Sequence, residues 1–205
     1  MNISIETITS GFDLVEKLVI VLGKTRQQLL GDPEAARQKL GEVISTLEDH
    51  FNGIYEPVAT FLALPLDDPA CLAENEKKLM AWEGGAIGSL TVKADFSCRQ
   101  IAQIYQEHLD RWFNRVLRKE NQELKDMKDI FNQLSGSDVH FYHLIGQLSY
   151  LLQEESSTIR KLLESNQASA RAYQLELRRK WMPKLQNCSS LLSDLNRLKL
   201  EYYNR

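Results

Sequence analysis

The sequence predicts an all-α protein: an elongated, mostly antiparallel bundle of about five long helices plus one short helix. Apolar residues recur at intervals of three and four along most of the 205 residues, which is the spacing of one face of an α-helix. The chain holds only ten Gly and five Pro, and the alternating apolar and polar runs typical of strands are nearly absent. With 43% apolar residues at this length, we expect a single helical-bundle domain over residues 1–205.

A capping signal separates the first two long helices. Residues 3–30 carry one apolar face, which ends at Gly31. Asp32 and Pro33 follow as an N-cap acid and a proline at the first helical position, so a second helix is expected to begin there. Pro57 lies inside this second helix and is expected to kink or split it, because a proline ring clashes with the carbonyl group four residues earlier.

The short helix follows a second pair of this kind, Asp68 and Pro69, and is expected to end near Trp82. Residues 84–95 come next and are expected to form a loop, because glycine and serine cluster at its start. This loop would separate an acidic N-terminal half of the chain from a basic C-terminal half.

The next long helix is expected over residues 96–134. Its apolar face is formed by Ile101, Tyr105, His108, Trp112, Val116, Leu124, Met127, Phe131 and Leu134. Residues 138–203 would be about 100 Å long as one straight helix, whereas a compact chain of this size has a radius of gyration of about 17 Å. We therefore expect a break at residues 165–169, and a bend at Pro183 in the last helix.

The charge of the chain is unevenly distributed. Residues 1–92 hold 14 acidic and 7 basic residues, a net charge of −7, and residues 93–205 hold 14 acidic and 18 basic residues, a net charge of +4. Two explanations are open: the halves pack together with complementary charges, or the basic half binds an anionic partner. We favour the internal explanation.

No residue pattern of a metal site stands out. Di-iron bundles require Glu-x-x-His on each of two helices, and none of the four histidines follows a glutamate at that spacing. Asp138, His140 and His143 leave a zinc site open, although a helix cap is the simpler interpretation. We expect no metal and no cofactor.

The patterns of common enzymes are also missing. The glycines at 84–89 lack the Lys-Ser/Thr of a phosphate-binding loop, and no strand is predicted before them. Cys98 has no base that the sequence reveals, so we interpret it as a packing residue. The protein is therefore predicted not to be an enzyme, and no small-molecule substrate is predicted, although a site assembled from distant parts of the chain stays open.

Basic side chains form two clusters that are candidates for binding an anionic partner. Arg111, Arg115 and Arg118 share one strip of the helix predicted over 96–134. The second cluster lies on the last helix and includes Arg178, Arg179 and Lys180. If the clusters converge, they could bind the phosphates of nucleic acid or of an acidic membrane. The alternative is that these side chains cover apolar surface and form ion pairs within the protein.

The sequence favours a non-catalytic helical bundle that acts through protein–protein interaction, as a scaffold, an adaptor or a homo-oligomer. Long amphipathic helices offer broad faces that fit a partner helix. The alternative function is the binding of nucleic acid or an acidic membrane through the basic clusters. The three cysteines lie far apart, and no apolar run is long enough to span a membrane, so a reduced, cytoplasmic location is expected.

Overall fold

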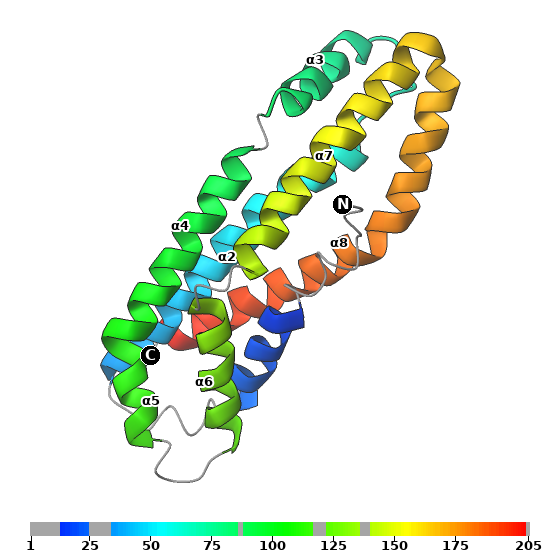
Figure 1. The fold of residues 1–205 in the computed structure, drawn as a ribbon. Coiled ribbons are helices and arrows are strands. Elements are labelled where there is room, and N and C mark those ends of the chain that lie inside the picture. Colours follow the sequence, from blue (N-terminus) through cyan, green and yellow to red (C-terminus); the bar gives the residue numbers. More distant parts are fainter. Residues whose placement is uncertain (1–12, 25–33, 86–87, 117–121, 136–139, 204–205) are drawn as a thin grey trace.

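The computed structural model describes residues 13–24, 34–85, 88–116, 122–135 and 140–203, and this part of the chain is helical without any strand. The predicted all-α bundle is therefore confirmed. Figure 1 shows long helices running beside one another along one axis of an elongated molecule.

Residues 13–24 form the first described helical segment. The further elements are α2 (Glu34–Leu62), α3 (Leu72–Glu83), α4 (Gly88–Ile104), the π-helical turn η1 (Tyr105–Leu109), α5 (Asp110–Val116), α6 (Gln122–Ser135), α7 (His140–Ser165) and α8 (Gln167–Tyr203). The most extensive helix pair is α2 with α8, and α7 packs against α3, α4 and α8. These contacts make α2, α7 and α8 the central helices of the bundle.

The buried apolar side chains form one core to which each described helix contributes. Aromatic rings fill the region where η1, α5 and α6 meet. Tyr105 and Phe131 are stacked with ring centroids 5.7 Å apart, and the Trp112 and Phe113 rings lie 4.7 Å apart. Such ring pairs add attraction beyond the area that they bury. This end of the bundle is therefore held by aromatic packing.

The loop expected over residues 84–95 is wrong for most of its length, because α4 begins at Gly88. Gly84 and Gly85 form a tight turn, and Gly85 has a φ angle of 91°, a region that glycine adopts without strain. The Gly84 amide donates to the Met80 carbonyl at 2.9 Å, which closes the end of α3. The glycines thus stop one helix, but the next helix begins almost immediately after them.

The single helix expected over residues 96–134 is also wrong, because the chain reverses direction within it. The Lys128 ammonium nitrogen lies 3.3 Å from an Asp110 carboxylate oxygen. In one continuous helix these residues would be about 27 Å apart. Figure 1 shows α5 and α6 as neighbouring helices at one end of the bundle. The hairpin places the apolar faces of both helices against the same core.

The π-helical turn changes which residues of this region are buried. A π turn contains one extra residue, so the side chains after it are rotated relative to a continuous α-helix. Leu109 and Phe113 are fully buried, whereas His108, predicted on the apolar face, is exposed. His108 was predicted to be buried because the sequence pattern was interpreted with a constant α-helical repeat.

The predicted break at residues 165–169 is confirmed. Asn166 lies between α7 and α8, and its side-chain oxygen accepts the backbone N–H of Ala168 at 2.9 Å. This is the N-cap arrangement that starts a new helix. Both helical prolines, Pro57 and Pro183, lie within continuous helices, so Pro57 does not split α2. α8 bends in its middle third (Figure 1), the part that contains Pro183.

Candidate functional site

The first basic cluster lies on the short helix α5. Arg111 and Arg115 are both exposed there, and Arg118 lies outside the described residues. Among the residues described, no acidic group forms an ion pair with either arginine. The two guanidinium groups therefore point into solvent beside the buried Trp112.

The second basic cluster lies on α8, where Arg178, Arg179 and Lys180 are all exposed. Lys180 has a local partner, because its ammonium nitrogen lies 2.7 Å from a carboxylate oxygen of Glu176. This pairing raises the pKa of Lys180 and lowers the pKa of Glu176. Lys180 is thus less available to an external anion than the two arginines before it.

The two clusters occupy different parts of the bundle. Figure 1 shows α5 at one end of the molecule, whereas the first half of α8, which includes residues 178–180, lies away from that end. The described residues of the two clusters therefore do not form one continuous basic patch.

Several basic side chains of the second half instead pair with acidic side chains of the first half. Arg171 lies 3.1 Å from Asp67, and Lys199 lies 2.7 Å from Glu48. A third pair joins Arg160 to Glu83 at 2.7 Å. These contacts support the internal explanation of the charge asymmetry.

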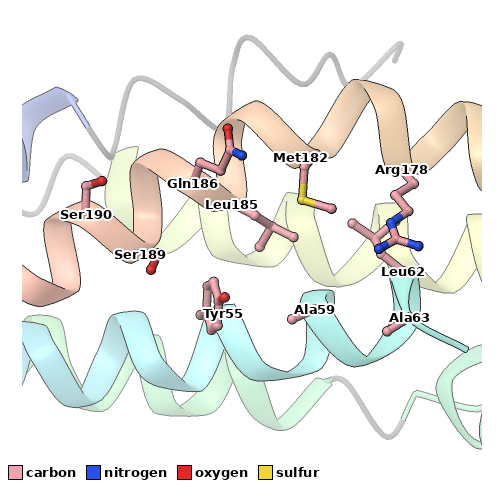
Figure 2. Close-up of a pocket in the computed structure, with 10 residues that line it drawn as sticks. All are labelled: Tyr55, Ala59, Leu62, Ala63, Arg178, Met182, Leu185, Gln186, Ser189 and Ser190. Atoms are coloured by element: carbon pink, nitrogen blue, oxygen red, sulfur yellow. The ribbon is translucent and has the colours of Figure 1, made fainter.

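A groove of about 400 Å³ runs between α2 and α8 (Figure 2). Its central lining is apolar and includes Ala59 and Leu62 of α2 and Met182 and Leu185 of α8. Arg178 is the one charged residue among the described residues of this lining. Arg178 was predicted as a member of the second basic cluster, but the groove beside it was not predicted from the sequence.

Polar contacts hold the end of α2 against α8 beside this groove. The buried side-chain amide of Gln174 donates to the carbonyl oxygens of Phe61 at 3.4 Å and Leu64 at 3.0 Å. The Gln167 amide donates to the Leu66 carbonyl at 2.7 Å. Phe61 lies in the last turn of α2, where carbonyl groups lack partners within the helix, and Leu64 and Leu66 follow this helix. The bonds therefore fix the end of α2 and the segment after it to α8.

A second feature that the sequence analysis missed is an exposed apolar pair on α4. Val92 is 72% exposed and Phe96 is 69% exposed. Because the two residues are four apart, they lie next to each other on one face of the helix. Their spacing is visible in the sequence, but it equals the spacing of a buried face, so it did not reveal exposure.

The thiols of the chain are not activated. Burial raises the pKa of Cys98 to about 11 and the pKa of Cys188 to about 12, so both remain protonated at neutral pH. A hydrogen bond to Asp68 raises the pKa of Cys71 as well. Cys98 packs against the core, in agreement with its interpretation as a packing residue.

Within the described part of the chain, no group of three or more His, Cys, Asp or Glu residues could hold a metal ion. The zinc hypothesis at Asp138, His140 and His143 falls outside the described side chains. None of the described helices is long and apolar enough to cross a membrane. No protein-family model, curated protein or solved structure matches this chain.

Proposed function

We propose that the protein is a non-catalytic helical bundle that acts by binding another protein, a partner or a second copy of itself. The observation that carries this proposal is the exposed pair Val92 and Phe96 on α4. Large apolar side chains favour burial, and covering both would contribute roughly 2–4 kcal/mol to a complex. An exposed aromatic ring is also the type of side chain that anchors many interfaces.

The surroundings of the pair fit an interface. Asp95 and Arg99 flank Phe96 and form an ion pair at 2.8 Å, so charged groups border the apolar residues. Interfaces commonly have this arrangement of an apolar centre with a polar rim.

The raised pKa values of the cysteines support the non-catalytic part of the proposal, because thiolates would be scarce at neutral pH.

The test replaces the apolar pair and asks whether association is lost. A photo-reactive amino acid at position 96 should cross-link to a partner or to a second copy when the protein is in a lysate of its source. Val92→Ser/Phe96→Ser should abolish the assembly detected by size-exclusion chromatography with light scattering. Leu200→Ser, at another exposed apolar side chain, serves as the matched control and should retain it. A strictly monomeric protein without cross-links at position 96 would reject the proposal.

The second candidate function is the binding of an anionic surface. It is favoured by the exposure of Arg111 and Arg115 without an acidic partner among the described residues. Such binding should weaken steeply with salt, because each phosphate contact releases counterions. Arg111→Glu/Arg115→Glu should then lose retention on nucleic acid or acidic liposomes at low salt. If the unmodified protein is retained on neither matrix, this candidate is rejected.

A further inference from the structure

The groove between α2 and α8 combines one cationic end with an apolar middle. We propose that it binds a free fatty acid, with the carboxylate at Arg178 and the acyl chain lying between the two helices. This inference is independent of the interface at Val92 and Phe96, which lies on α4. It also adds a small-molecule ligand that the sequence did not predict.

The shape of the groove fits an extended chain. Its volume of about 400 Å³ lies within the range of small-molecule sites. The lining on α8 extends from Arg178 to Ser190, a distance of about 18 Å at 1.5 Å per residue. Ala59 in the last turns of α2 and Ala63 just after its end have side chains too small to fill the space beside α8. The groove is therefore long and narrow, like a fatty acid and unlike a compact ring system.

The middle of the groove offers an apolar surface to the acyl chain. The side chains of Met182 and Leu185 on α8 are only half buried, and they lie opposite Ala59 of α2 (Figure 2). The side chain of Met182 is flexible and adapts its shape to an apolar neighbour. Covering these side chains with methylene groups removes apolar surface from water on both partners. The chain of the ligand thus supplies the main attraction.

Arg178 determines where the head group lies. Figure 2 shows its side chain extending from α8 toward Leu62 and Ala63 at one end of the groove. No acidic residue forms an ion pair with it within the described part of the chain, in contrast to Lys180 and Arg171. A guanidinium group binds a carboxylate through two parallel hydrogen bonds. Arg178 is therefore positioned to hold a carboxylate at the mouth of an apolar groove.

The opposite end of the groove has no charge among its described lining residues. Tyr55 and Ser189 approach each other there from α2 and α8 (Figure 2). A ligand with a second charged group would leave that group unpaired at this end. The lining consequently favours a molecule with one anionic head over a dicarboxylate.

The groove is formed before a ligand arrives. The hydrogen bonds from Gln174 to the carbonyl oxygens of Phe61 and Leu64 fix the end of α2 beside Arg178. Leu62 is buried and forms a floor that does not need to rearrange. A preformed site binds more tightly because less conformational freedom is lost on binding.

The proposal is tested by titrating the purified full chain with laurate in a calorimeter, below the concentration at which laurate forms micelles. Laurate should bind saturably, and octanoate should bind more than about tenfold more weakly because fewer methylene groups are buried. Arg178→Gln should weaken laurate binding by about tenfold or more, the loss expected for a charge-assisted contact. Arg179→Gln is the matched control, since this neighbouring arginine does not line the groove.

Two further measurements distinguish the groove from non-specific adsorption. Ala59→Phe fills the middle of the groove and should abolish binding, with circular dichroism verifying that the variant folds. Dodecanol has the same chain without the carboxylate, so it should bind the wild type more weakly and should not distinguish Arg178→Gln from wild type. The proposal is overturned if laurate does not saturate, if Arg178→Gln binds like Arg179→Gln, or if the folded Ala59→Phe variant binds normally.

Discussion

Arg160 of α7 holds Glu83, the last residue of α3, through two hydrogen bonds. Its Nε donates to Glu83 Oε2 at 2.7 Å and its Nη2 donates to Oε1 at 3.3 Å, while the Ser157 hydroxyl also donates to Oε1 at 2.9 Å. These bonds lower the pKa of Glu83 and raise the pKa of Arg160. The contact joins residues 77 apart in the sequence and fixes the end of α3 to the centre of the bundle.

We expect Arg160→Met to lower the melting temperature, because it leaves the Glu83 carboxylate with one hydrogen bond fewer on each oxygen. A double-mutant cycle with Glu83→Gln should show a coupling larger than that of the exposed pair Asp95 and Arg99, which serves as control. Equal coupling in both cycles would contradict this prediction.

The ion pair should also make stability depend on pH. Because the pKa of Glu83 is lowered in the folded state, the stabilisation that Glu83 contributes should be lost as the pH falls through that lowered value.

Trp112 tests the packing of α5. Its side chain is 4% exposed, so Trp112→Ala should reduce the free energy of unfolding by about 3–5 kcal/mol. The indole N–H has no hydrogen-bond acceptor among the described residues. Trp112→Phe should therefore cost less than about 1.5 kcal/mol, because it removes this unsatisfied donor and keeps an aromatic ring. Urea denaturation of both variants provides the measurement, and an unchanged midpoint for Trp112→Ala would show that the ring is not buried.

The π-helical turn leads to a comparison of two neighbouring residues. Leu109 is fully buried, so Leu109→Ala should reduce the free energy of unfolding by about 2–5 kcal/mol. His108 is exposed, so His108→Ala should change it by less than about 0.5 kcal/mol. Chemical denaturation of the two variants checks the register. The reverse order of effects would indicate a continuous α-helix without the π turn.

His50 makes the stability depend on pH. It is buried in α2, and this burial lowers its pKa from 6.5 to about 4. Between these two values the unfolded chain binds a proton at this position and the folded chain does not, so stability falls as the pH is lowered. The loss amounts to roughly 3 kcal/mol at about pH 4, since each pKa unit is worth about 1.4 kcal/mol.

The test measures urea unfolding of the wild type and of His50→Gln at several pH values from 7 to 4. The variant has no titrating group at this position, so its stability should fall less steeply over this range. The difference between the two proteins should be constant above about pH 7 and should change as the pH approaches 4. Parallel pH profiles would show that His50 does not titrate differently in the two states.

The sequence by itself determined the helical class, because the three-and-four spacing of apolar residues is a local property that any packed helix must satisfy. It also located the break within residues 165–169, a polar stretch that lacks the large apolar residues found on either side of it. These features depend on residues that are close in sequence, so no knowledge of distant contacts was needed.

Only the tertiary structure decided how the helices meet. The reversal between α5 and α6 and the π turn at Tyr105–Leu109 depend on packing against a shared core, which a local pattern does not encode. The same holds for the candidate sites. The groove combines Ala59 with Arg178, which are far apart in the chain, and the exposure of Val92 and Phe96 depends on which faces of α4 its neighbours cover. A periodic apolar residue can be buried or left for a partner, and only the arrangement of the other helices distinguishes the two.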